Sequence, residues 1–205
     1  MVHKSIVFDL DHTIGYFKQF IYILNHITRD KENDSYQDLL ELFPEVFRPN
    51  IFGLFEYLLQ KRRTKRIQSI LLYTNNNNDV FVNKIISYID YKLKEPLFDE
   101  IITPMHPLRT EKIKSYEDLI KCSSLNSETK ICFIDDKKHL NMKHDNIFYV
   151  QCEPYVHEIK TSEIHKRIHI QLPEYTPHHC TLNSNNQKRV TEQIWNRIHI
   201  FISRN

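Results

Sequence analysis

The chain has 205 residues, a length that fits one domain or one domain with a short appendage. Its 40% hydrophobic and 26% charged residues exclude a disordered chain, and a formal net charge of +2 gives no global electrostatic reason to bind nucleic acid or a membrane. Only two glycines are present, Gly15 and Gly53, which excludes the glycine-rich loops of dinucleotide-binding folds and P-loop NTPases.

The cysteines and the apolar runs indicate the compartment. No CxxC pair occurs among the four cysteines, which are Cys122, Cys132, Cys152 and Cys180. Neither a disulfide scaffold nor a cysteine-rich zinc site is therefore expected. The apolar runs are too short to span a bilayer, and the first residues lead directly into a strand, with no room for a signal peptide. We expect a soluble intracellular protein of the cytoplasm or nucleus, with no membrane partner.

Five short, continuous apolar runs predict the strands of a buried parallel sheet. They are residues 4–8, 68–73, 100–103, 130–134 and 146–150. Segments with apolar residues at helical spacing, residues 80–93 and 115–122, lie between them. This alternation predicts an α/β fold with a Rossmann-like parallel sheet of about five strands and helices on both faces.

Two segments fall outside this alternation. Residues 15–65 are predicted to hold two or three amphipathic helices with a break near Arg48, and their first part, residues 15–48, to form a small helical cap or lid. From residue 153 the chain becomes rich in proline and histidine, and a last helix is predicted for residues 187–202. We expect residues 1–152 to form the main domain and residues 153–205 an extension that docks on it through this helix.

Acidic, hydroxyl and amide side chains follow three of the predicted strands. In chain order they are Asp9, Asp11 and Thr13 after the first strand, Thr74 and Asn75 after the second, and Asp135 and Asp136 after the fourth. The carboxyl ends of parallel strands are where ligands bind in open α/β sheets. Clustered carboxylates are costly unless a cation or hydrogen bonds compensate them, and oxygen ligands suit Mg²⁺. The Thr74 hydroxyl and the backbone N–H of Asn75 are suited to hold a phosphoryl oxygen, although a threonine that ends a strand is more often only structural.

In combination and in this order, the signatures DxDxT, an apolar run ending in Thr, and an apolar run ending in DD resemble the haloacid dehalogenase (HAD) superfamily of phosphohydrolases. Arg48-Pro49, with the apolar residues that follow it, is similar to the RP-x-x-x-x-FL segment of the FCP/SCP-type C-terminal-domain phosphatase branch. The segment 116–119 is similar to its K-D-L segment, and 134–136 to its IDD. The resemblance covers residues 4–152 and leaves the extension unexplained.

The resemblance implies a Mg²⁺-dependent phosphomonoester hydrolase with an aspartyl-phosphate intermediate. Asp9 would be the nucleophile and Asp11 the general acid and then base. Thr74 would orient the phosphoryl group, with Thr13 and Asn75 also binding substrate. Asp9, the Asp11 carbonyl and Asp136 would hold Mg²⁺, with Asp135 beside them directly or through water.

One family feature is displaced in this chain. Glu117 stands where the family has the K-D-L lysine, which neutralises the nucleophile and the phosphoryl oxygens. Lys114, one turn earlier on the same predicted helix, is the best substitute, with Lys112 next. If neither reaches the site, the protein would be slow or inactive.

Three functions remain open. A phosphatase is favoured, with a Ser/Thr phosphoprotein or a small phosphoester as substrate. A phosphatase of nucleotides or polynucleotide ends would use the same mechanism, although the net charge does not support a nucleic-acid partner. A non-catalytic HAD-like binding module is the third, kept open by Glu117 but disfavoured by the retained acids. The basic run 61–66 is expected to be a solvated helix end, with a phosphate-rich partner as the sharper alternative, and its lack of interleaved aromatic residues argues against a single-strand platform. The scattered histidines after residue 153 do not have zinc-site spacing. Abundant Asn, Ile, Lys and Tyr suggest an AT-rich genome, such as that of a large DNA virus or a protist.

Overall fold

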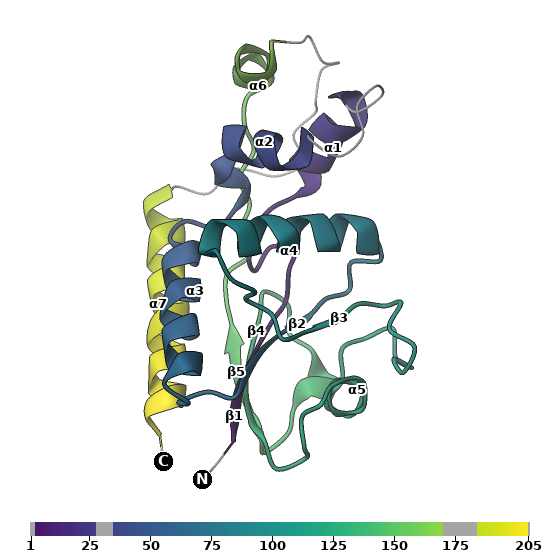
Figure 1. The fold of residues 1–205 in the computed structure, drawn as a ribbon, viewed down its shortest axis with the longest axis vertical. Helices are drawn as coiled ribbons and strands as arrows, with labels where there is room; N and C mark the ends of the chain where they lie inside the picture. Colours follow the sequence, from purple (N-terminus) through teal and green to yellow (C-terminus); the bar gives the residue numbers. More distant parts are fainter. Residues whose placement is uncertain (1–2, 28–34, 170–183, 205) are drawn as a thin grey trace.

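The computed structural model describes residues 3–27, 35–169 and 184–204. Its centre is a five-stranded parallel sheet with the order β3-β2-β1-β4-β5 (Figure 1). The strands are β1 (Lys4–Phe8), β2 (Ser69–Tyr73), β3 (Glu100–Ile102), β4 (Lys130–Asp135) and β5 (Ile147–Gln151). Each predicted strand is present with its ends shifted by at most one residue, which confirms the predicted fold class.

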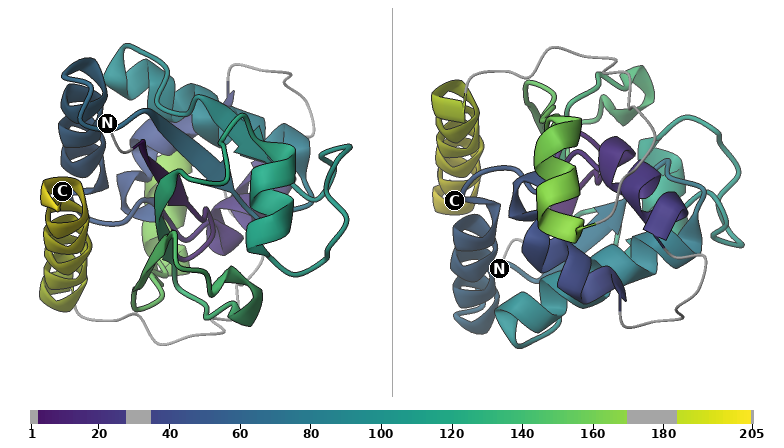
Figure 2. Two further views of the ribbon diagram at one scale, coloured as in Figure 1. Left: turned by 90° about the horizontal axis from the view of Figure 1, so that it is seen from below. Right: turned by 90° about the horizontal axis from the view of Figure 1, so that it is seen from above.

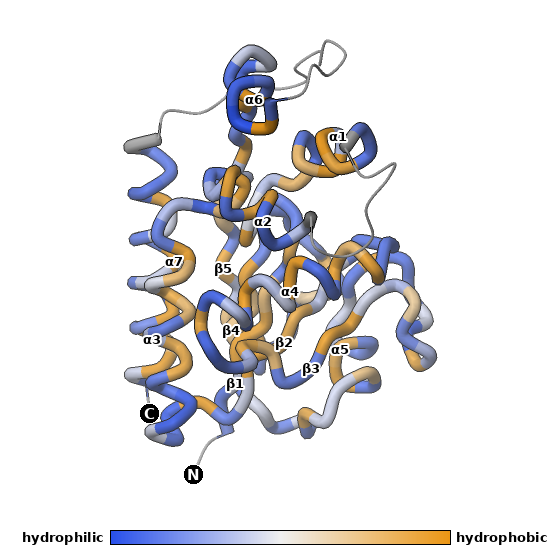
Figure 3. The backbone as a smooth tube through the Cα atoms, turned by 45° about the horizontal axis from the view of Figure 1, so that its top comes forward, coloured by the Kyte–Doolittle hydropathy of each residue, from blue (hydrophilic) through white to orange (hydrophobic). Residues whose placement is uncertain are grey.

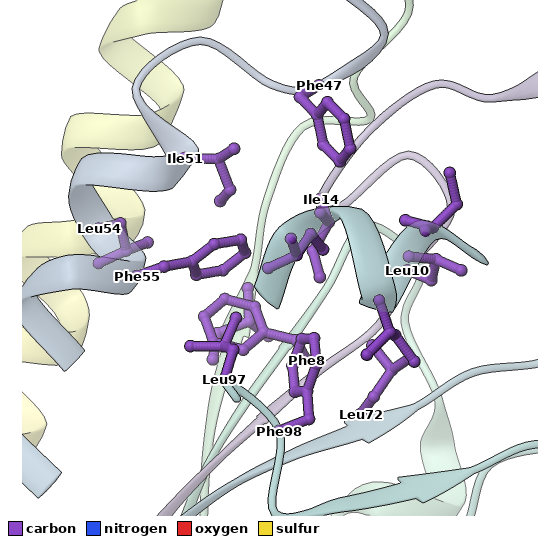
Figure 4. Close-up of a cluster of buried hydrophobic side chains, with 14 of the residues drawn as sticks. Phe8, Leu10, Ile14, Phe47, Ile51, Leu54, Phe55, Leu72, Leu97 and Phe98 are labelled. Atoms are coloured by element: carbon purple, nitrogen blue, oxygen red, sulfur yellow. The ribbon is translucent and has the colours of Figure 1, made fainter. Parts of the chain in front are cut away.

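The central strand β1 divides the core between the two faces of the sheet. Successive side chains of a strand point to opposite faces, so Ile6 and Phe8 enter the larger core and Val7 the smaller one. In the larger core the ring of Phe8 meets that of Phe55 edge to face, with centroids 5.7 Å apart (Figure 4). Apolar stretches of the chain accordingly lie along the strands and on the inner sides of the helices beside them (Figure 3).

Helices cover both faces. The larger core contains side chains of α3 (Ile51–Arg63), α4 (Asp79–Leu93) and α7 (Ser184–Ser203), whereas α5 (Tyr116–Cys122) closes the smaller core. Helices α3 and α7 lie side by side in all three ribbon views (Figures 1 and 2), and the rings of Tyr57 and Trp195 join them at 5.3 Å. Of the helices in the described ranges, none combines the length and the apolarity needed to cross a membrane.

A small group of short helices stands over the carboxyl end of the sheet (Figure 1). The insertion after β1 contributes α1 (Lys18–Ile27), α2 (Ser35–Leu42) and the 3-10 turn η1 (Pro44–Val46), and the C-terminal segment contributes α6 (Thr161–Ile168). Gln19 exchanges two hydrogen bonds of 2.7 Å with the backbone of Ile159, and Arg167 donates to the Leu42 carbonyl at 2.9 Å. The segment from residue 153 to 168 therefore packs with the insertion, while α7 packs on α3 and the sheet.

Candidate active site

The three strands that precede the predicted site residues are neighbours in the sheet. Phe8 of β1 is in register with Leu72 of β2 and with Ile134 of β4. The Asp9 N–H continues the ladder by donating to the Ile134 carbonyl at 2.9 Å. The strand ends therefore bring the polar residues after β1, β2 and β4 to one edge of the sheet.

The loop after β1 returns its apolar side chains to the core and leaves its polar ones at the edge. The Ile14 N–H donates to the Leu10 carbonyl at 2.9 Å, and both side chains are buried in the larger core. His12 takes a left-handed conformation with φ 63°. A side chain at Gly15 would come within 2.5 Å of both the Phe17 ring and the Val46 carbonyl, so only glycine fits this turn.

Lys114 is the centre of the charged cluster. Its ammonium donates to Asp9 Oδ1 and, at 2.7 Å, to Asp135 Oδ2, and the residue is 1% exposed. Lys112, the second candidate, is exposed. The prediction that Lys114 lies on the helix is wrong, because Ser115 is the N-cap of α5 and its hydroxyl accepts from the Asp118 N–H at 3.2 Å. The lysine therefore extends from the loop that leads into the helix.

Asp118, which the sequence did not indicate as a site residue, fixes this loop. Its carboxylate accepts from the Glu111 N–H at 2.6 Å, from the Thr110 N–H at 3.1 Å and from the Thr110 hydroxyl at 2.8 Å. Burial alone would raise the pKa of Asp118, but these hydrogen bonds lower it below its ordinary value. The carboxylate thus holds the chain just before Lys114 in place.

The acids that share Lys114 differ in their electrostatics. Burial raises the pKa of Asp9 to about 7, with the charges of Asp135 and Asp11 adding to the effect and Lys114 opposing it. Burial would raise the pKa of Asp135 as well, but donors from His139, Lys114 and the Lys137 N–H bring it below its ordinary value. Hence Asp135 is an anion that stabilises the Lys114 ammonium, whereas burial favours the protonated form of Asp9 even beside that ammonium.

Thr13 and Asn76 tie the remaining acids to the loops. The Thr13 hydroxyl donates to Asp9 Oδ2 at 3.3 Å and accepts from the Asp136 N–H at 3.1 Å. The Asn76 amide donates to Asp11 Oδ2 at 3.0 Å. Burial raises the pKa of Asp11, and this hydrogen bond partly offsets the rise. Asn76 was not predicted as a site residue because it stands in a run of four asparagines.

The loop after β2 is held by a third unpredicted residue, Arg109. Thr74 is fully buried, and its hydroxyl accepts from the Asn76 N–H at 3.0 Å, so its own proton can be donated to a ligand. Arg109 donates to the Thr74 carbonyl at 2.7 Å and to the side-chain oxygen of Asn75. Asn75 itself is exposed. The arginine thereby joins this loop to the one that carries Lys114.

Arg48 links the edge to the C-terminal extension. Its buried guanidinium donates to the carbonyls of Thr13 and His12 at 2.7 Å each, and to that of Glu153 at 2.8 Å. It also donates to Gln187 Oε1 at 3.2 Å. The sequence indicated Arg48 only as part of the RP-x-x-x-x-FL-like segment. Its hydrogen bonds to the loop after β1, to Glu153 and to Gln187 could not be predicted, because these partners are far from it in the sequence.

The donor set fits a hard divalent cation. One carboxylate oxygen from each of Asp9, Asp135 and Asp136 lies within 4.8 Å of the others. The Asp11 carboxylate is engaged by Asn76 instead. The pKa of Asp136 is raised by burial and by the charge of Asp135. Oxygen-only ligands at this spacing are those that Mg²⁺ prefers.

Three of the cysteines and C-terminal histidines lie outside the described residues. They are Cys180, His178 and His179.

Comparisons with known proteins find a likeness among solved structures. No family model matches the chain, and no curated protein matches it. Among solved structures it is similar to a variant of the fission yeast RNA polymerase II CTD phosphatase Fcp1 bound to beryllium fluoride, with a TM-score of 0.45 and 18% identity. The similarity covers 97% of this chain and 50% of that one. The chain thus spans about half the length of that structure, and its function has to be argued from the site itself.

Proposed function

We propose that the chain is a Mg²⁺-dependent phosphomonoester hydrolase of HAD type that forms an aspartyl-phosphate on Asp9. The observation that carries the proposal is the buried Lys114 ammonium between Asp9 and Asp135, beside the three-carboxylate group with Asp136. In this proposal residues 1–152 form the catalytic domain, residues 15–48 its lid, and residues 153–205 an extension docked on it.

Asp9 attacks the phosphorus, and the bond from phosphorus to the leaving oxygen breaks. Lys114 and Thr13 contact different oxygens of Asp9 and hold the carboxylate for this attack. The Lys114 cation and the Thr74 hydroxyl offset the charge on the phosphoryl oxygens. Bound Mg²⁺, held by Asp9, Asp136 and the Asp11 carbonyl with Asp135 beside them, would supply further positive charge to those oxygens.

Asp11 moves the proton in both half-reactions. It gives its proton to the leaving oxygen and then, as a carboxylate, takes one from the water that attacks the phosphorus and releases Asp9. Its hydrogen bond from Asn76 keeps the carboxyl aimed at one place, and its burial favours the protonated form needed first. This agrees with the acid and base role proposed for it.

The favoured substrate is a phosphoprotein with phosphoserine or phosphothreonine. Within the described residues the insertion after β1 supplies the short helices α1 and α2 and the turn η1 as a lid, and such a small lid suits a bulky substrate. The position of Lys114 also supports an enzyme over a binding module. The module was considered because Glu117 stands where the family has a lysine, and Lys114 supplies an ammonium to Asp9 and Asp135 instead. A phosphopeptide compared with a 5′-phosphorylated oligonucleotide would separate the two enzyme hypotheses.

The direct test is hydrolysis of p-nitrophenyl phosphate with Mg²⁺ and with EDTA. We expect metal-dependent turnover that Asp9→Asn abolishes and that the matched variant Asp38→Asn, at an exposed position of α2, retains. Acid quenching during turnover of a ³²P-labelled phosphoester should trap label on the wild type and none on Asp9→Asn. A wild type that folds, as judged by circular dichroism, yet shows no turnover above Asp9→Asn would refute the proposal.

A further inference from the structure

The amino ends of the strands form the edge of the sheet opposite the acid cluster, and two hollows lie there. The first, of about 350 Å³, is lined by His3, Lys4, Arg62, Lys65 and Arg66 with two uncharged neighbours. The second, of about 310 Å³, is lined by Lys4, Lys130 and Arg204, with Phe148, Phe201 and the segment 145–147. Because both contain Lys4, they form one continuous surface. We name its six cations the basic strip: Lys4, Arg62, Lys65, Arg66, Lys130 and Arg204.

The strip concentrates positive charge that the whole chain does not show. Its six lysines and arginines face one acid in the lining of the two hollows, Asp145, in a chain with a formal net charge of only +2. Lys4 and Lys130 are register partners on adjacent strands, where like charges repel. Burial and the nearby charge of Arg66 lower the pKa of Lys4. Placing these cations together therefore costs free energy in the protein alone.

Some of the cations have structural partners and others do not. Arg62 pairs with Asp99 at 3.0 Å, Lys4 donates to the Ile202 carbonyl at 2.9 Å, and Lys130 donates to the Asn146 side chain. Lys65 and Arg66 are exposed and form no ion pair within the described part of the chain. They follow Thr64, the C-cap of α3.

Neighbouring elements set the shape of the strip. The ends of α3 and α7 lie beside the start of β1 (Figure 1), and the strip continues from there to Lys130, the register partner of Lys4 on β4. The three adjacent strands β2, β1 and β4, at roughly 4.8 Å spacing, span about 10 Å, the rise of about three nucleotides at 3.4 Å each. The ring of Phe148 is covered by the guanidinium groups of Arg197 and Arg204, at 4.6 and 5.0 Å. The strip thus offers cations in a line, and its ring is not free to stack on a base.

We propose that the basic strip binds the sugar-phosphate backbone of a nucleic acid, without regard to base sequence. A line of cations with no free stacking surface favours phosphates over bases. The five residues of β1 place the strip about 17 Å from the acid cluster, so its ligand is not the reacting group. The proposal is independent of the phosphatase activity, which small phosphoesters measure separately.

The test uses fluorescence anisotropy of a labelled 20-base-pair DNA duplex with the full chain. Contacts from about three phosphates predict a slope of roughly −2.7 in the plot of log affinity against log salt, or about 40-fold weaker binding at 200 mM than at 50 mM salt. The double variant Lys65→Gln with Arg66→Gln should reduce the slope to about half and leave p-nitrophenyl phosphate hydrolysis unchanged. The matched control is Lys188→Gln with Arg189→Gln, an adjacent exposed lysine and arginine near the other end of α7.

Three results would overturn the proposal. No duplex binding by the wild type at 50 mM salt would remove it outright. Equal weakening by the two double variants would assign the binding to net charge instead of the strip. Polyglutamate that competes as well as unlabelled duplex, at equal charge, would assign the surface to an acidic protein. A duplex of unrelated sequence that binds equally well would support the proposal.

Discussion

The two edges of the sheet handle charge in opposite ways. At the carboxyl edge Lys114, Asp9 and Asp135 are buried and hold one another, whereas at the amino edge Lys65 and Arg66 are exposed. A buried charge that loses its partner keeps its desolvation penalty, whereas an exposed charge is solvated by water whether or not it is paired. The first edge should therefore tolerate no change in charge, and the second should lose binding without losing stability.

Lys114→Met should have the largest effect. It leaves Asp9 and Asp135 buried without their shared cation, and we expect a loss of about 3–5 kcal/mol in the free energy of unfolding. The rate constant kcat should fall by about 100-fold or more, because a donor to the reacting group is gone. Urea unfolding and p-nitrophenyl phosphate hydrolysis measure the two losses. The control is Lys112→Met, at an exposed position near Lys114. An equal loss of stability and kcat in this variant would contradict the assignment of Lys114.

Arg48→Met should come next, because it removes the buried donor of three backbone carbonyls. Those of His12, Thr13 and Glu153 would lose a hydrogen bond each, and we expect a loss of about 2–4 kcal/mol in stability. Arg189→Met, at an exposed position, should change stability by less than about 0.5 kcal/mol. Thermal unfolding of both variants provides the comparison. Equal melting temperatures would show that the hydrogen bonds of Arg48 do not stabilise the fold.

Asp118→Asn should have an intermediate and pH-dependent effect. The pKa of Asp118 is lower in the folded chain than in the unfolded one, so its carboxylate stabilises the fold above about pH 4 and this contribution disappears as the pH falls through the folded value. We expect a loss of about 1–3 kcal/mol at pH 7 that shrinks toward zero in acid. Urea unfolding at pH 7, 5 and 3 tests this, and a loss independent of pH would mean that the carboxylate charge is not what matters.

Lys65→Gln with Arg66→Gln should have the smallest effect on the fold. Both side chains are exposed beyond the end of α3, so the free energy of unfolding should change by less than about 0.5 kcal/mol. Urea unfolding of this double variant beside the wild type makes the measurement. A loss above 1.5 kcal/mol would show that the amino edge relies on its charges as the carboxyl edge does, and the contrast between the edges would fail.

The sequence predicted the sheet and the acids because both are local signals. Continuous apolar runs specify strands such as β2 and β4, and the acids directly follow those runs. Lys114 was predicted as the substitute for a family lysine whose position Glu117 occupies. Its place before the helix, instead of on it, depends on the N-cap at Ser115. Arg109 and Asp118 were missed because their partners lie in loops, which no periodicity identifies. One part of the extension packs on the lid and the other on the sheet. This arrangement likewise depends on contacts between residues more than 100 positions apart.

The position of Arg48 has a consequence for synthesis on the ribosome. Its guanidinium needs Glu153 and Gln187, and the latter is 139 residues further along the chain. At about 5–20 residues per second, roughly 7 to 28 s pass between the synthesis of Arg48 and that of Gln187. During that time Arg48 lacks its Gln187 partner, although the loop after β1 and Arg48 itself are already present. The nascent chain therefore carries the acids long before Arg48 can complete its contacts with the C-terminal segment.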